Sequence, residues 1–195
     1  MYKRQSLLSH RPLLLGIGAI FLYVGGEVSI GSFLVNLFSE ADIGALSHED
    51  AGRLMSLYWG GAMVGRFIGS WVMHRVKPSH VLTVNALSAI VLILLAMLLK
   101  GHIAMVALLA VGLCNSVMFP TIFSLSIDGL GERVGEGSGL LCMAIVGGAV
   151  VPVVMGEMAD HIGLLSAFFI PLLCYVYIMY FGTSMNRFSS SPTKA

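Results

Sequence analysis

The sequence predicts an all-α integral membrane protein with six transmembrane helices, on two observations. Of its 195 residues 57% are hydrophobic and only 11% are charged, whereas soluble domains carry about 25% charged residues. Long runs also lack Asp, Glu, Lys and Arg, and a helix needs only about 20 apolar residues to cross the bilayer. These runs are 78–99, 101–127, 137–156 and 161–186.

Two further spans each hold a single charge. Residues 13–38 are interrupted only by Glu27, and residues 54–72 only by Arg66. A transmembrane β-barrel would need alternating apolar and polar residues, and runs such as 91–99 are apolar on every side. The predicted helices are therefore 13–38, 54–73, 81–99, 103–126, 138–157 and 164–182. A short segment, 1–12, precedes the membrane domain, 13–182, and a tail, 183–195, follows it.

The distribution of Lys and Arg predicts the orientation of the six helices. Eight of them fall at the termini and in the even-numbered loops, and two fall in the other loops, of which the first is acidic. Because cytoplasmic loops are enriched in Lys and Arg, both termini are expected in the cytoplasm. The eight are Lys3, Arg4, Arg11, Arg75, Lys77, Arg133, Arg187 and Lys194, and the two are Arg53 and Lys100.

Several functional classes lack support in the sequence. A net charge of +1 argues against a nucleic-acid partner, since such proteins carry basic surfaces. The zinc-protease pattern, the serine-hydrolase elbow and the phosphate loop are all absent. The first apolar run is too long for a signal peptide and contains Glu27, so it is expected to be retained. We therefore expect no enzyme, no cofactor and no metal site.

Small residues and one cation mark the second predicted helix. Gly61, Gly65 and Gly69 are four residues apart, a spacing that lets another helix approach closely. This face either packs statically or slides during transport. Arg66 lies beside Gly65, and a charge inside a span either is paired, faces a cavity or extends to the headgroups.

Glu27 lies just past the midpoint of the first helix and shares a face with Tyr23. A carboxyl group at that depth is stable when it is protonated or hydrogen-bonded. It can exchange a proton as a cavity opens, bind sugar hydroxyls, or clamp a neighbouring helix. Asn36, nine residues later, lies on the opposite face of an ideal helix and would join Glu27 only if the helix bends.

The fourth helix carries a polar residue and a proline near its middle. Pro120 removes a backbone donor and frees the carbonyl group of Ser116, so a kink or opening is expected there, beside Asn115. Pro152, after Gly147 and Gly148, gives the fifth helix a similar weak point. Freed backbone groups at this depth line a cavity or meet another helix.

Tyr58 and Trp59 lie about one turn inside the outer end of the second helix. Aromatic residues there are usually part of the interfacial belt, and stacking on a sugar is the alternative.

Four blocks of the chain resemble one transporter family. Residues 23–36 are similar to the seventh helix of bacterial glucose/galactose transporters, residues 57–69 to the eighth, 115–124 to the tenth and 137–149 to the eleventh. These transporters belong to the fucose–galactose–glucose proton symporter family of the major facilitator superfamily. Residues 65–75 also resemble the superfamily's cytoplasmic motif.

The resemblance implies a fold and a function. The family has twelve helices in two halves around a central sugar site, so this chain resembles the second half and a six-helix first half is the expected partner. Proton-coupled sugar transport is the implied activity, and the expected ligands are sugar and protons. Glu27 and Asn115, with Tyr23, Asn36 and Trp59, are the expected sugar contacts, and Gly65, Arg66 and Gly69 the expected gate residues.

Two hypotheses follow from this resemblance. The chain is the carboxyl-terminal half of a sugar–proton symporter, whether as a truncated product or as one half of a split transporter. Alternatively, it is a non-transporting fragment or assembly subunit whose apolar face packs on a partner.

Overall fold

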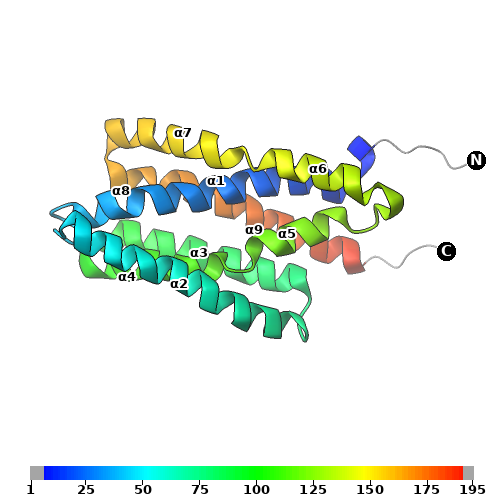
Figure 1. Cartoon of the computed structure of the whole chain (residues 1–195), viewed down its shortest axis with the longest axis horizontal. Coiled ribbons are helices and arrows are strands. Elements are labelled where there is room, and N and C mark those ends of the chain that lie inside the picture. Colours follow the sequence, from blue (N-terminus) through cyan, green and yellow to red (C-terminus); the bar gives the residue numbers. More distant parts are fainter. Residues whose placement is uncertain (1–6, 191–195) are drawn as a thin grey trace, which may run out of the picture.

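A computed structural model describes residues 7–190, and this part of the chain is helical with no strand. Lys3, Arg4 and Lys194, used above to predict the orientation, lie outside the described residues. The helices cross the molecule six times in alternating directions (Figure 1). They are η1 (Leu7–Ser9), α1 (Arg11–Ser39), α2 (His48–Met73), α3 (Pro78–Leu99), α4 (Gly101–Asn115), α5 (Met118–Ile127), η2 (Gly131–Arg133), α6 (Val134–Ala144), α7 (Gly147–Ile162), α8 (Leu164–Ala167) and α9 (Phe169–Ser190).

The all-α membrane fold is confirmed. Five stretches are long and apolar enough to cross a bilayer: Arg11–Ser39, Pro78–Leu99, Gly101–Ile127, Gly131–Ile162 and Leu164–Arg187. The remaining pass, α2, falls short of that hydropathy, because its middle carries glycines, aromatic residues with polar groups, and Arg66. The sixth predicted helix ended at 182, and α9 continues to Ser190.

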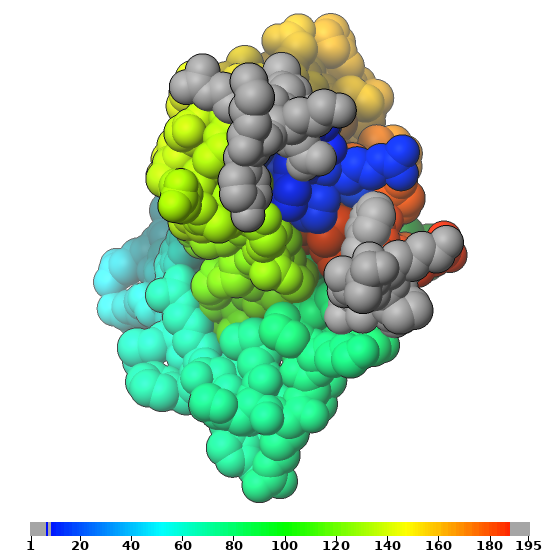
Figure 2. All heavy atoms as spheres, turned by 90° about the vertical axis from the view of Figure 1, so that its right-hand side faces the viewer, coloured from blue at the N-terminus to red at the C-terminus, as the bar shows by residue number. Residues whose placement is uncertain are grey.

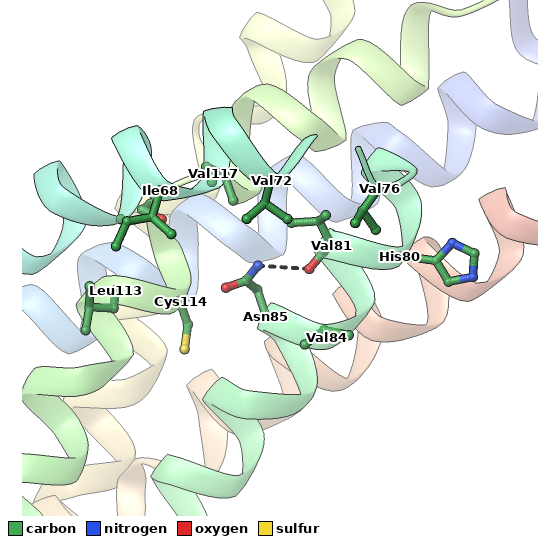
Figure 3. Close-up of a pocket in the computed structure, with 13 residues that line it drawn as sticks. Ile68, Val72, Val76, His80, Val81, Val84, Asn85, Leu113, Cys114 and Val117 are labelled. Carbon is green, nitrogen blue, oxygen red and sulfur yellow. Dashed lines mark hydrogen bonds between the residues drawn. The ribbon is translucent and has the colours of Figure 1, made fainter. Parts of the chain in front are cut away.

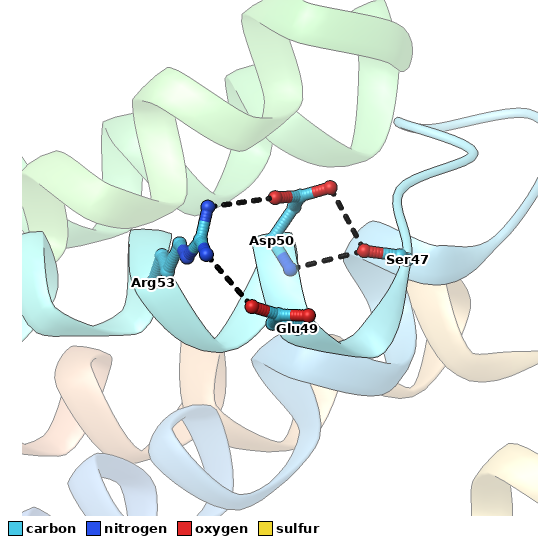
Figure 4. A network of polar contacts seen from close by, with 4 residues as sticks. All are labelled: Ser47, Glu49, Asp50 and Arg53. Carbon is cyan, nitrogen blue, oxygen red and sulfur yellow. Dashed lines mark hydrogen bonds and ion pairs between the residues drawn. The ribbon is translucent and has the colours of Figure 1, made fainter.

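Local sequence signals define the amino-terminal end of α2. Ser47 caps α2, and its Oγ accepts a 3.1 Å hydrogen bond from the backbone N–H of Asp50. Glu49 and Asp50 in the first turn favour the positive end of the helix, and Arg53 pairs with Glu49 at 2.7 Å (Figure 4). These charges hold the amino-terminal end of α2 outside the apolar layer.

Two of the six passes are broken in the middle. Ser116 and Val117 separate α4 from α5, and Ile145 and Val146 separate α6 from α7. The first break confirms the opening predicted beside Pro120. The second lies before Gly147, and α7 continues through Pro152, so the weak point is close to where it was predicted but not at the proline.

The core is built around α1, which contacts α2, α5, α6, α7 and α9. Three tyrosines and three phenylalanines are its largest fully buried side chains. At the second break, a Cβ atom on Gly147 would meet the Phe21 backbone of α1. Close approach of α7 to α1 therefore requires glycine there. The large buried rings are Tyr23, Tyr58, Tyr175, Phe38, Phe168 and Phe181.

Candidate functional site

The break between α4 and α5 leaves a backbone carbonyl that another helix binds. Pro120 has no N–H group, so the carbonyl oxygen of Ser116 cannot accept the usual helical hydrogen bond. The Nε of Arg66 on α2 donates to this oxygen at 3.3 Å. The charge predicted inside the second helix is thus used to satisfy the backbone of the broken helix.

Asn115, the last residue of α4, joins three other helices. Its Nδ2 donates to the Tyr58 hydroxyl of α2 at 2.8 Å, and its Oδ1 accepts from the Tyr175 hydroxyl of α9 at 2.8 Å. Its backbone oxygen accepts from the Tyr23 hydroxyl of α1 at 2.9 Å. We call Tyr23, Tyr58, Asn115 and Tyr175 the tyrosine–asparagine cluster.

The cluster is closed to solvent in this conformation. Asn115 and Tyr23 are 2% exposed, and Tyr58 and Tyr175 are fully buried. Each polar atom of the Asn115 side chain already has a partner, as buried polar groups require. A direct contact between Asn115 and a sugar stays a prediction, and it would require these hydrogen bonds to open.

Glu27 lies on α1 one turn after Tyr23 and is half-buried. Its carboxyl group interacts with the Tyr23 side chain and electrostatically with Arg66. These contacts place the acidic group between the closed cluster and the cation that binds the helix break. A role of Glu27 in sugar binding or proton exchange stays a prediction.

One side of α1 is open between Glu27 and Asn36. Ser32 and Asn36 are exposed, and Val28 and Val35 are half-buried. At 100° a residue, Glu27 and Asn36 lie about 180° apart, at the two edges of this open side. α1 is one continuous helix over these residues, and a shared contact of Glu27 and Asn36 with one sugar stays a prediction.

Trp59 lies beside this open side of α1. Its side chain is 48% exposed, and its ring comes within 3.4 Å of the position that a Cβ atom on Gly31 would occupy. Gly31 is one turn after Glu27, so an aromatic surface and a carboxyl group border the same part of α1. The ring offers an apolar stacking surface and the carboxyl group can accept hydrogen bonds, and contact of either with a sugar stays a prediction.

Tyr58 differs from its neighbour, and the expectation that it belongs to the interfacial belt is wrong. It is fully buried and bound to Asn115, with the Trp59 ring packed edge-on at 5.3 Å. The belt pattern is read from depth alone, and depth does not say which side of α2 turns inward.

The glycines of α2 pack against the broken helix. A Cβ atom on Gly65 would lie 2.8 Å from the carbonyl oxygen of Leu113, and one on Gly69 would overlap Val117. Gly61 faces the Leu113 side chain. The close helix approach that the spacing predicted is confirmed, and it occurs within this chain; a gating role for Gly65, Arg66 and Gly69 stays a prediction.

Tyr175 is the member of the cluster that the sequence analysis missed. It lies in the second turn of α9, in a run without charges. A hydroxyl group at membrane depth needs a hydrogen-bond partner, and this requirement is the signal in the sequence that could have identified Tyr175. Nothing in the sequence indicated that the partner was Asn115.

The fold and this cluster can now be compared with known proteins. A family model described as Major Facilitator Superfamily matches residues 2–145. The chain belongs to the major facilitator superfamily. Among solved structures, FucP, a transporter of this superfamily crystallised in the outward conformation, superposes with a TM-score of 0.87 at 30% identity, over 94% of this chain and 47% of that one.

Relatives of known sequence support the resemblance to glucose/galactose transporters. The chain is 51% identical to a glucose/galactose transporter of Brucella abortus over 92% of this chain and 44% of that protein. It is 34% identical to the L-fucose-proton symporter of Escherichia coli over 84% of this chain and 37% of that protein. The chain thus spans about half the length of the relatives it matches.

Proposed function

We propose that this chain is the carboxyl-terminal half of a proton-coupled hexose transporter. The observation that carries the proposal is the half-length match to a glucose/galactose transporter at 51% identity. In the superfamily, substrate sites lie near the membrane midplane between the two repeats. Glu27 lies near the middle of α1, beside the open side of that helix.

The sugar-binding wall would be the open side of α1 with Trp59. Glu27 and Asn36 supply hydrogen-bonding groups at its two edges, and Trp59 supplies an exposed ring. Tyr23 and Asn115 would reach the sugar only when the hydrogen bonds of the tyrosine–asparagine cluster open. In the closed cluster Tyr23 contacts Glu27.

The partner would be a first half of six helices. Large apolar side chains of α2 and α7 are exposed, among them Phe67 at 75%, Trp71 at 61% and Val153 at 71%. Surfaces of this kind meet either lipid or another helix bundle. The assembly-subunit alternative uses the same surfaces without a transported sugar.

The proposed location is the bacterial inner membrane, with both termini in the cytoplasm. Arg11, Arg75, Lys77, Arg133 and Arg187 lie at the end where α1 begins and α9 ends (Figure 1), and Arg53 and Lys100 lie at the other. Because Lys and Arg favour the cytoplasmic side, the first end is assigned to the cytoplasm.

Transport assays with and without a first half test the proposal. The chain is expressed alone, and also together with the first half of the Brucella relative, and vesicles are given labelled glucose, galactose or L-fucose under a proton gradient. Uphill accumulation only with both halves is expected. Accumulation by this chain alone would contradict the half-transporter assignment, and a folded complex without binding or transport of any sugar would favour the assembly subunit.

A further inference from the structure

An apolar groove opens between α2 and α3 at the end of the molecule where α1 begins and α9 ends (Figure 3). The two helices barely touch, because α2 packs on α4 whereas α3 packs on α4 and α9. The space between them measures about 360 Å³. Its walls include Ile68, Val72, Val81 and Val84, and residues of the α4–α5 break form its floor.

The lining fits an alkyl chain better than a polar molecule. Asn85 is the single amide side chain in it, and its Nδ2 donates to the Val81 carbonyl oxygen of its own helix at 2.9 Å. The other deep lining residues are aliphatic side chains, glycines, Cys114 and Ser116, and His80 lies at one end of the groove.

The groove covers most of the depth of one leaflet of a membrane. Its α2 wall runs from Gly65 to Val72, which at 1.5 Å a residue is about 11 Å, and Val76 in the connection after α2 extends it further. The hydrocarbon core is about 30 Å thick, so one leaflet is about 15 Å. An acyl chain that begins at the Val76 end would therefore reach the floor near the bilayer midplane.

A basic rim lies at the same end of the groove. Arg75 and Lys77 are exposed in the α2–α3 connection, and the Arg75 guanidinium lies 4.7 Å from the Trp71 ring. Within residues 7–190 neither forms an ion pair, whereas Arg53, Lys100 and Arg133 do. Lys77 also borders a neighbouring pocket that contains Asp128. In Figure 2 the green connection projects from the rest of this end.

We propose that this groove binds one anionic glycerophospholipid. One acyl chain lies between α2 and α3, and the phosphate group contacts Arg75, Lys77 and His80. Basic pockets between membrane helices are suited to anionic headgroups, and each Lys or Arg near such a surface contributes about fivefold in affinity. Lipid binding here does not require the proposed sugar transport, although the floor of the groove is the Ser116 region that Arg66 binds.

Native mass spectrometry of the purified chain tests the headgroup. The chain is titrated with phosphatidylglycerol and with phosphatidylcholine of identical acyl chains. Preferential retention of phosphatidylglycerol is expected, and the variant Arg75→Gln/Lys77→Gln should bind it about 25-fold more weakly. The control Arg53→Gln/Lys100→Gln removes the same charge at the opposite end and should bind normally. Equal retention of the two lipids, or equal loss in both variants, would overturn the proposal.

A substitution in the groove tests whether an acyl chain binds there. Val84 is 61% exposed on the groove wall, so Val84→Trp should fill the groove and reduce phosphatidylglycerol retention at least tenfold. Leu98→Trp, at a position 77% exposed near the far end of α3, should leave retention unchanged. Retention unaffected by Val84→Trp would show that lipid binds by surface charge alone and would overturn the site.

A fluorescence measurement covers the case in which Val84→Trp fails to fold. In a Trp59→Phe chain Trp71 is the remaining tryptophan. Brominated phosphatidylglycerol should quench Trp71, and unbrominated phosphatidylglycerol should relieve the quenching about tenfold more effectively than phosphatidylcholine. Equal competition by the two lipids would mean bulk lipid contact, and absence of quenching would mean that no lipid lies at the rim, where Trp71 contacts Arg75; either result contradicts the proposal.

Discussion

Arg66 donates a hydrogen bond from Nε to the carbonyl oxygen of Ser116, at 3.3 Å. The same carbonyl has no helical donor, because Pro120 stands four residues later. A cation of α2 therefore holds the broken helix α4–α5 at its midpoint. Movement of α2 relative to α4 and α5 would have to break or remake this contact.

Replacing Arg66 by Ala should impair turnover more than sugar affinity, with the first half supplied by fusion. Loss of a hydrogen bond from a charged group, about 1.5–3 kcal/mol, should lower the maximal rate about tenfold or more while KM stays within about twofold. Uptake kinetics give both values, and Arg53→Ala, an exposed cation at the other end of α2, is the control. A change confined to KM would show that Arg66 contacts the sugar.

The tyrosine–asparagine cluster should contribute to folding stability through Tyr175. Tyr175→Phe leaves the Asn115 Oδ1 without its hydrogen-bond donor. The free energy of unfolding should fall by about 1 kcal/mol. Single hydrogen bonds between membrane helices contribute about 0.6 kcal/mol on average, and a buried polar group left without a partner costs more. Equilibrium unfolding in mixed micelles measures the change. Tyr180→Phe, on the same helix and 54% exposed, should be neutral, and equal effects of the two changes would deny the cluster a stabilising role.

A side chain at position 147 should lower the stability of the protein, because α7 packs closely on α1 at the α6–α7 break. Gly147→Ala would place its Cβ against the Phe21 backbone, and overpacking costs about 1–3 kcal/mol. Gly139→Ala, in the preceding helix with no atom within 4 Å of the new Cβ, is the matched control. Thermal unfolding should separate the two, and an unchanged Gly147→Ala chain would mean that α1 and α7 can move apart at no cost.

Glu27→Gln distinguishes three roles for the carboxyl group in a fused transporter. We expect accumulation and exchange of sugar to weaken together, with affinity about tenfold lower, because Gln retains the shape but loses charged hydrogen bonds. Loss of uphill accumulation with exchange preserved would instead assign the coupled proton to Glu27. Normal transport by a less stable protein would leave Glu27 a purely structural role.

The orientation is tested by single cysteines in a chain whose three native cysteines are replaced by Ala. A cysteine at Ala45 should react with a membrane-impermeant maleimide in intact cells, and one at Arg133 only after lysis. This labelling pattern is expected because Lys and Arg are enriched on the cytoplasmic side of a membrane. The reverse labelling pattern would invert the assignment of both termini.

The sequence predicted the helical passes and the position of the first break, because both depend on local chemistry. Charge-free runs of membrane length admit few other structures, and Pro120 removes a backbone donor wherever the helix packs. It also singled out Glu27, Arg66 and Asn115, since polar groups at membrane depth are rare. Their partners could not be predicted, because Tyr23, Tyr58 and Tyr175 lie 92, 57 and 60 residues from Asn115.

The membrane fold, the superfamily resemblance and the unusual residues are therefore properties of the sequence itself. Which face of each helix turns inward was decided by tertiary packing: neighbouring Tyr58 and Trp59 differ only by 100° of rotation, yet one is buried and the other is 48% exposed. The same packing moved Asn115 into a closed cluster and left Glu27 beside the open side of α1. A polar side chain in a bilayer must find a partner, and only the assembled bundle determines which one.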